Sequence, residues 1–113
     1  VIKDSDTRNL YQIAQEIKES ALRYIRGELL AEDTALSTIS VTNLYSFEAF
    51  QVTPPVYEHQ SAMFSITSKF VSWDEGIVRK FNLTLSYDAR VADCQTAIAF
   101  LNNIKNRLEA KAL

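Results

Sequence analysis

The sequence is poor in the residues that most often build small ligand sites. It has two glycines, two prolines, one cysteine and one histidine among 113 residues. Two glycines are too few for a loop that cradles phosphates, and a single cysteine excludes an internal disulfide. Zinc takes three or four ligands, so one cysteine and one histidine do not make a site. The sequence therefore predicts no metal and no cofactor.

Long apolar runs and clustered positive charge are also lacking. No apolar stretch approaches the roughly 18 residues that a membrane-spanning helix needs, so we expect no direct membrane insertion of this segment. Twelve basic and fourteen acidic residues give a net charge of −2. The basic residues are scattered, whereas a protein that tracks phosphates concentrates them on one face. We therefore expect no nucleic acid as partner, and the compartment is left unknown.

Length and composition indicate one globular domain. An apolar fraction of 47% in 113 residues is enough to bury a core without disulfides or metals. We expect residues 1–113 to form a single α+β domain. Because the first residue is valine and not methionine, we also expect a processed form or a fragment of a longer chain.

Both ends of the chain carry the pattern of an amphipathic helix. Apolar side chains recur every three or four residues from Leu10 to Tyr24, which predicts a helix over residues 6–30, capped at residue 5, 6 or 7. Its regular part is expected to end near Gly27, and residues 28–35 either continue it or form a short second helix. A second helix is predicted over residues 89–112, capped by Asp88 or Asp93. Its apolar stripe consists of Cys94, Ala97, Leu101, Ile104 and Leu108.

Between the helices, apolar and polar residues alternate, as in strands with one buried face. One strand is predicted from Thr38 to the double proline at residues 54–55, with a bulge at residues 43–44. Residues 64–87 predict a hairpin with residues 73–76 as its loop. This loop sets Ser72 opposite Ile77, and the same register pairs Ala62 with Tyr87, Phe64 with Leu85 and Ile66 with Leu83.

The order helix, three strands, helix predicts an α+β fold. Two amphipathic helices each need an apolar surface, and the sheet offers one. We therefore expect a two-layer sandwich, in which a three-stranded antiparallel meander carries the N- and C-terminal helices on one face (α-β-β-β-α). The other face of the sheet, rich in serine and threonine, is expected to be polar and open.

The two most reactive side chains do not predict catalysis. Cys94 falls on the apolar stripe of the last helix, where a buried core cysteine is expected. His59 follows the double proline in a polar loop, where a solvated histidine is expected. A cysteine nucleophile needs an adjacent base, and nothing in the sequence brings these two together. The sequence therefore predicts that the chain is not an enzyme.

A few apolar residues interrupt the predicted polar face of the sheet. Trp73 beside the hairpin loop, with Val71 and Val78 on the same outer face, predicts an exposed docking patch. The alternative is that Trp73 folds back onto its own hairpin. The candidate interaction surface consists of Trp73, Val71, Val78, Met63 and Leu44.

One segment resembles a known family. Residues 78–108, VRKFNLTLSYDARVADCQTAIAFLNNIKNRL, resemble the strand-then-helix unit of inner-membrane accessory proteins of type IV pilus and type II secretion machines. The resemblance implies a membrane-associated assembly factor. The strands that usually follow this helix in that family are absent here.

Two functional hypotheses follow. The favoured one is a non-catalytic protein–protein interaction module, a structural assembly factor that self-associates into a homo-oligomer or docks on a protein partner through a free sheet edge or the Trp73 patch. The alternative is a small-ligand-binding domain, or an enzyme of modest chemistry, with a pocket between helices and sheet. That pocket would be lined by Tyr45, Phe47, Phe64, Phe81 and Tyr87.

Overall fold

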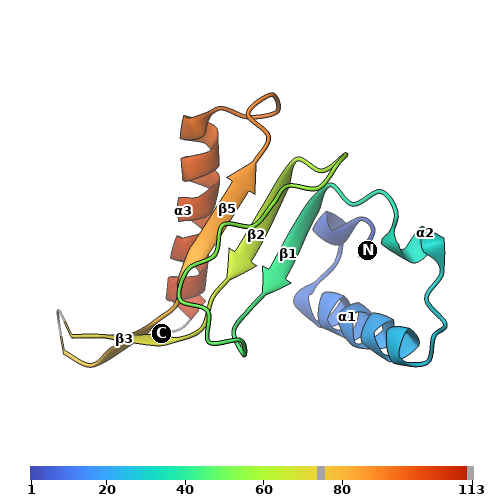
Figure 1. The fold of residues 1–113 in the computed structure, drawn as a ribbon, viewed down its shortest axis with the longest axis horizontal. Helices are drawn as coiled ribbons and strands as arrows, with labels where there is room; N and C mark the ends of the chain where they lie inside the picture. Colours follow the sequence, from blue (N-terminus) through green and yellow to red (C-terminus); the bar gives the residue numbers. More distant parts are fainter. Residues whose placement is uncertain (74–75, 112–113) are drawn as a thin grey trace. The chain divides into compact units, whose positions relative to one another are not determined.

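The computed structural model describes residues 1–73 and 76–111 (Figure 1). It forms two compact units, residues 1–37 and residues 38–113. The first unit holds a 3-10 turn (Ser5–Thr7), α1 (Leu10–Ile25) and α2 (Ala31–Thr34). The second holds β1 (Ile39–Asn43), β2 (Ala62–Ile66), β3 (Phe70–Ser72), β4 (Val78–Lys80), β5 (Leu83–Tyr87) and α3 (Cys94–Lys111). The α+β class is confirmed, and the single domain stays a prediction.

Helix α1 begins at a reciprocal cap. The Asn9 side chain accepts a hydrogen bond from the Gln12 backbone N–H at 2.9 Å, and the Gln12 side chain accepts one from the Asn9 backbone N–H at 2.9 Å. The predicted start at residue 6 is therefore wrong, because residues 5–7 form a separate 3-10 turn. The predicted end near Gly27 is confirmed: its φ of 69° lies in the left-handed region that glycine adopts without strain.

We expect Asn9→Ala to lower the free energy of unfolding of the first unit by about 1 kcal/mol, because the Gln12 backbone N–H loses the side-chain oxygen to which it donates. Far-UV circular dichroism during urea unfolding measures this loss of helix. Asn106→Ala, at an exposed position inside α3, is the matched control and should change stability little. Equal urea midpoints for Asn9→Ala and the unmodified chain would contradict the role of the cap.

Helix α2 confirms a short second helix after Gly27, and an ion pair holds it to α1. The Arg23 guanidinium contacts both carboxylate oxygens of Asp33, at 3.2 and 2.6 Å. The Leu30 backbone N–H donates to the same carboxylate at 2.8 Å. This backbone bond, and then Arg23, lower the pKa of Asp33, although partial desolvation opposes them.

The second unit contains a mixed sheet in the order β1-β2-β5. Strands β2 and β5 are antiparallel and pair Ala62 with Tyr87, Phe64 with Leu85 and Ile66 with Leu83, which confirms the predicted register. Strand β1, in contrast, is parallel to β2, so the predicted antiparallel meander is wrong. The physical reason is the connection of residues 44–61, which is long enough to return the chain to the starting end of the sheet.

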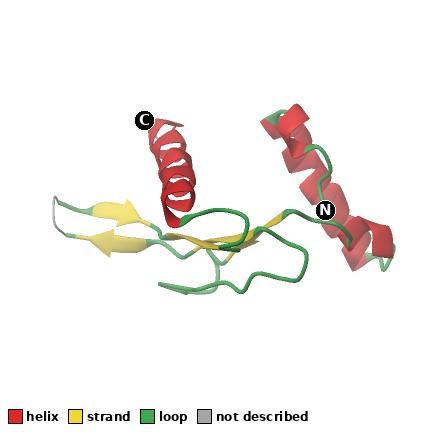
Figure 2. Ribbon diagram, turned by 90° about the horizontal axis from the view of Figure 1, so that it is seen from above, coloured by secondary structure: helices red, strands yellow, loops and turns green. Residues whose placement is uncertain are grey.

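The two faces of the sheet are covered by different parts of the chain (Figure 2). Helix α3 lies on one side and buries Ala97. The connection of residues 44–61 runs on the opposite side, and hydrogen bonds to its backbone carbonyls hold it there. Ser68 N–H donates to Ala49 at 3.0 Å, and the Asn82 side-chain amide donates to Phe50 at 2.7 Å. The expected open polar face is therefore wrong.

The expected layer of two helices on one face of the sheet stays a prediction. Only α3 belongs to the unit that contains the sheet. Helix α1 has no buried residue, and its apolar side chains Leu10, Ile17 and Tyr24 are exposed. Its periodicity correctly predicts a helix, but not a partner for the apolar stripe.

A one-residue offset separates the sheet from the β3–β4 hairpin. The last pair of β2 and β5 is Ile66 with Leu83, and the first pair of β3 and β4 is Phe70 with Lys80. Three residues therefore lie opposite two, as in a β-bulge. The pair near the turn is Ser72 with Val78, not Ser72 with Ile77 as predicted. The predicted loop at residues 73–76 includes residues 74–75, which lie outside the described residues.

Candidate functional site

The predicted docking surface is not assembled on one face. Val71 pairs with Arg79, whereas Val78 pairs with Ser72, so the two valines point to opposite faces of the hairpin. The one-residue offset at the bulge causes this difference. Trp73 is 75% exposed, which disfavours folding back onto its own hairpin. A docking role for these residues stays a prediction.

The other two members of that surface lie away from the hairpin. Met63 is only 2% exposed, and its sulfur lies 3.4 Å from the Thr42 hydroxyl. Its assignment to an exposed patch is wrong, because the connection of residues 44–61 covers that side of the sheet. Leu44 is half-buried, and its backbone N–H donates to Ile66 at 2.8 Å.

Neither reactive side chain forms a catalytic pair in the described part of the chain. His59 is solvated as predicted, and its Nε2 lies 3.6 Å from a Glu58 carboxylate oxygen. Cys94 is exposed, not buried, because it occupies the first turn of α3. A hydrogen bond with Cys94, together with partial desolvation, raises the pKa of the Tyr87 phenol.

Other kinds of site are also missing from the described residues. No three histidine, cysteine, aspartate or glutamate side chains in residues 1–73 and 76–111 gather closely enough to hold a metal ion. Over the same ranges, no helix combines the length and apolar character needed to cross a membrane. The five aromatic residues of the alternative pocket hypothesis come from different elements. Phe64 is buried in β2, and Tyr87 ends β5. Tyr45 and Phe47 lie in the turn after β1, and Phe81 follows β4.

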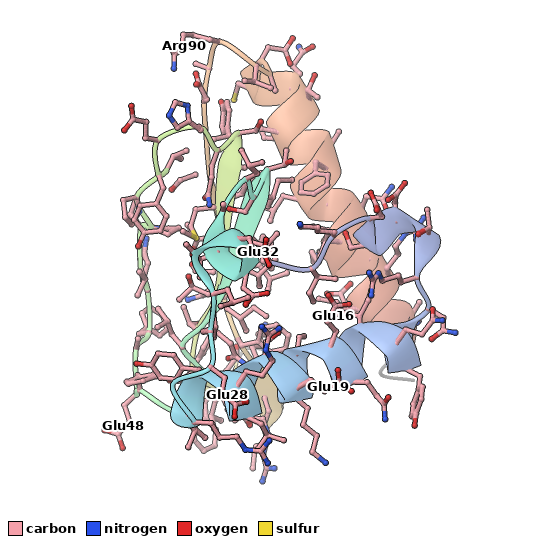
Figure 3. All side chains as sticks on the ribbon, turned by 90° about the vertical axis from the view of Figure 1, so that its right-hand side faces the viewer. Glu16, Glu19, Glu28, Glu32, Glu48 and Arg90 are labelled. Atoms are coloured by element: carbon pink, nitrogen blue, oxygen red, sulfur yellow. The ribbon has the colours of Figure 1, made fainter. Side chains whose placement is uncertain are left out.

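One end of the second unit has a cavity of about 660 Å³ between residues 56–61 and residues 88–91. Arg90 projects from this end, opposite to Glu48 (Figure 3). The Asp88 carboxylate accepts bonds from the Arg90 side chain at 3.0 and 2.8 Å and from its backbone N–H at 2.9 Å. These bonds, the side-chain ones foremost, lower the pKa of Asp88 to about 2. The pair closes the turn into α3.

We expect Arg90→Ala to raise the pKa of Asp88 toward its ordinary value of 3.8. A lowered pKa means that the ionised carboxylate stabilises the fold above about pH 4, and that this contribution is lost as the pH falls from 4 to 2. The variant should lose part of this acid dependence. Carboxyl carbon NMR titration measures the pKa directly, and Arg107→Ala, whose guanidinium bonds the Asn103 amide oxygen, is the control. An ordinary pKa for Asp88 in the unmodified chain would refute the expectation.

An apolar groove of about 640 Å³ lies between the strands and the C-terminal half of α3. Its lining includes Phe81, which follows β4, Leu83 from β5, and Leu101 and Leu108 from the helix. Phe81 and Leu108 are both 42% exposed. The sequence did not predict the groove, because the alternation assigned these residues to the core. The available signal was the apolar stripe of α3, which continues to Leu108, beyond the residues that face β5.

The whole chain matches one protein family. The sequence profile of the 2-oxoacid dehydrogenases acyltransferase (catalytic domain) family matches residues 1–113. The dihydrolipoyllysine-residue succinyltransferase component of the 2-oxoglutarate dehydrogenase complex of Escherichia coli (strain K12) is 32% identical over 96% of this chain. The match covers 28% of that protein, so the chain spans less than a third of its length.

Solved structures agree in fold. The probable dihydrolipoamide acetyltransferase of Listeria monocytogenes 4b F2365 superposes with a TM-score of 0.85 at 31% identity, over 96% of this chain and 49% of that one. A truncated catalytic core of the 2-oxoacid dehydrogenase multienzyme complex from Thermoplasma acidophilum gives a TM-score of 0.81 at 27% identity, over 96% and 49%. Relatives of this chain therefore form the cores of multienzyme complexes.

These findings overturn the functional prediction. A non-catalytic, non-enzymatic assembly module is wrong, because the matched family and the relatives are acyltransferases. The resemblance of residues 78–108 to pilus and secretion proteins was likewise misleading, since a strand followed by a helix occurs in many folds. Along its whole length, the chain belongs to the family of 2-oxoacid dehydrogenase acyltransferases, in the region of their catalytic domain.

Proposed function

We propose that this chain forms part of the catalytic domain of a dihydrolipoyllysine acyltransferase in a 2-oxoacid dehydrogenase complex. The observation that carries the proposal is the family match over residues 1–113. The reaction would move an acyl group to or from a sulfur of a dihydrolipoyl-lysine side chain. Relatives of similar identity act on acetyl and succinyl groups, so the proposal names the acyl class only.

The chain contributes scaffold to this reaction, not the reacting groups. Acyl transfer between thiols needs a base that forms the thiolate and donors that stabilise the oxyanion. In the described residues His59 is solvated in a loop, and Cys94 contacts Tyr87. We infer that residues outside this chain, in the half of the relatives' domain that it does not match or in a neighbouring copy, complete the site.

We further propose that the protein assembles as a homo-oligomer. The Thermoplasma acidophilum relative, described as the catalytic core of a multienzyme complex, supports this. Trp73, which is 75% exposed on the β3–β4 hairpin, is a surface that copies could bury. Light scattering behind a sizing column tests the assembly, and a monomer at all concentrations of the complete domain would contradict it.

The enzymatic proposal is tested with a chimera. This chain replaces the matched half of the Listeria monocytogenes acetyltransferase domain, and S-acetyl- and S-succinyl-N-acetylcysteamine serve as acyl donors to free dihydrolipoamide. We expect S-acyl-dihydrolipoamide, detected by mass spectrometry, to form faster than in the absence of enzyme. A chimera that is folded by circular dichroism but inactive with both donors would refute the proposal. The His59→Ala variant of the chimera should keep full activity. A loss of activity in this variant would show that His59 of this chain acts as a catalytic base.

A further inference from the structure

We propose that the second unit binds one water molecule in its interior, where the water bridges the hydroxyls of Ser65 and Thr84. The site lies between the middle of β2 and the middle of β5, on the side of the sheet that the connection of residues 44–61 covers. The proposal goes beyond acyl transfer and does not depend on it. It rests on a buried hydroxyl without a partner and on a row of hydroxyls across the three strands.

The Ser65 hydroxyl is buried and unsatisfied. Ser65 has no exposed surface, and its Oγ has no hydrogen-bond partner among the described residues. The hydroxyl of Thr67, which is equally buried, accepts a hydrogen bond from the Asn82 backbone N–H at 2.8 Å. An unpaired buried polar group is rare in folded proteins, because it gives up its bonds to bulk water and gains none in return. Ser65 Oγ therefore calls for a partner that is small enough to be enclosed with it.

The second unit itself encloses Ser65. A further part of the relatives' domain, or a second copy of the chain, can only cover surface that is still exposed. Ser65 has none left to cover, so neither could reach its Oγ without moving the strands or the connection. A water molecule that is trapped as the unit folds needs no such movement. The burial of Ser65 thus favours water over a protein group as the partner.

Ser65 is the middle member of a row of three hydroxyls. It pairs with Thr42 in β1 on one side and with Thr84 in β5 on the other. In an antiparallel pair such as Ser65 and Thr84, both side chains point to the same face, with Cβ atoms about 4.5–5.5 Å apart. The Thr42 hydroxyl lies 3.4 Å from the Met63 sulfur, which identifies this face as the one that the connection covers. At this spacing, one water can contact two neighbouring hydroxyls.

Water matches the bonding capacity of this row. Serine and threonine hydroxyls each donate one hydrogen bond and accept others, so one water can donate to one hydroxyl and accept from the next. Buried waters typically make about three hydrogen bonds. Ser65 and Thr84 supply two of them. The Thr42 oxygen, whose proton points to a weakly accepting sulfur, can accept the third. The row is uncharged, which disfavours an ion at the same place.

A high-resolution crystal structure of the full chain tests the site directly. We expect a water peak within about 2.5–3.0 Å of both Ser65 Oγ and Thr84 Oγ1. The peak should be lost in Ser65→Ala. The proposal is overturned if no peak lies beside Ser65 Oγ, or if that oxygen bonds directly to a protein group.

Urea unfolding tests the same site by the sign of the change. If Ser65 Oγ holds a water, Ser65→Ala should lower the urea midpoint by about 0.5 M, since it removes a satisfied hydrogen bond. If the hydroxyl has no partner, alanine removes an unsatisfied buried group, and the midpoint should rise. A rise or an unchanged midpoint therefore contradicts the proposal. Should Ser65→Ala fail to fold by circular dichroism, the crystal structure of the unmodified chain decides.

A double-mutant cycle shows whether Ser65 and Thr84 share one water. Thr84→Val keeps the shape of the side chain and removes its hydroxyl. The double variant should unfold near the midpoint of the less stable single variant, because both substitutions remove the same water. Ser40→Ala is the matched control: its hydroxyl donates to the Gln60 side chain at 2.9 Å, so its effect should add to that of Ser65→Ala. Additive effects of Ser65→Ala and Thr84→Val would refute a shared water.

Discussion

Replacement of Phe64 by alanine is expected to lower the free energy of unfolding of the second unit by about 3–5 kcal/mol. Phe64 is 7% exposed in the middle of β2, the central strand. It pairs with Val41 in β1 and Leu85 in β5, so its ring belongs to the packing of all three strands. Alanine would remove most of the apolar area of the ring and leave a cavity that these neighbours cannot fill without moving the strands.

Urea unfolding followed by far-UV circular dichroism measures this loss. Phe47→Ala is the matched control: Phe47 is 72% exposed in the turn after β1, and its replacement should change stability by less than about 0.5 kcal/mol. If Phe64→Ala proves too unstable to purify, Phe64→Leu should give a smaller measurable loss in the same direction. Equal effects at positions 47 and 64 would show that Phe64 is not part of a packed core.

The second large effect is expected for Thr67→Val, which should cost about 1–3 kcal/mol. Thr67 is fully buried at the bulge between the sheet and the β3–β4 hairpin. Its hydroxyl oxygen accepts a hydrogen bond from the Asn82 backbone N–H at 2.8 Å, and its own N–H donates to the Asn82 carbonyl at 3.1 Å. Valine has the same shape but no acceptor, so it would leave the Asn82 N–H buried without a partner.

Two controls separate the hydroxyl from the shape of the side chain. Thr67→Ser keeps the acceptor and loses one methyl group, for which we expect a cost of about 0.8 kcal/mol. Thr53→Val changes an exposed threonine and should be nearly neutral. The expectation fails if Thr67→Val unfolds at the same urea concentration as the unmodified chain, or if Thr67→Ser is the more damaging of the two.

The register of β2 with β5 could be predicted because both strands have one apolar face. A slip of one residue would have turned Phe64 or Leu85 to the wrong side, so alternation alone selected the pairing that the structure contains. The same reasoning predicted the wrong register beyond Ile66. The alternation does not indicate the bulge, in which the Thr67 hydroxyl accepts a hydrogen bond. Because of that single inserted residue, Val71 and Val78 lie on opposite faces of the hairpin and do not form the predicted patch.

The direction of β1 could not be predicted in this way. Alternation reports which side chains share a face, but not which strand lies beside them or whether it is parallel. The stripe of α1 similarly predicted a helix without identifying its partner, and Cys94 lay on a real stripe but in a turn that the sheet does not cover. In each case a pattern along the chain fixed local structure, and contacts between distant segments decided burial.

Function was predicted wrongly for a different reason. The sequence lacks an adjacent nucleophile and base, and this absence wrongly predicts a protein that is not an enzyme. The chain matches only 49% of the solved Listeria monocytogenes acetyltransferase chain, so the absence says nothing of the other half. The match to the acyltransferase family extends over residues 1–113.

The parallel pairing of β1 with β2 has a consequence for the order in which the second unit folds. The hairpin strands can zip from the turn outward, because Ser72 pairs with nearby Val78 and each later pair closes a slightly longer loop. In the parallel pairing of β1 with β2, the two residues of each pair are equally far apart in the sequence, from Ile39–Ala62 to Asn43–Ile66. The first contact of β1 must therefore close the whole connection at once. That closure costs entropy before any pairing repays it. We therefore expect β1 to pair with β2 after β2 has paired with β5.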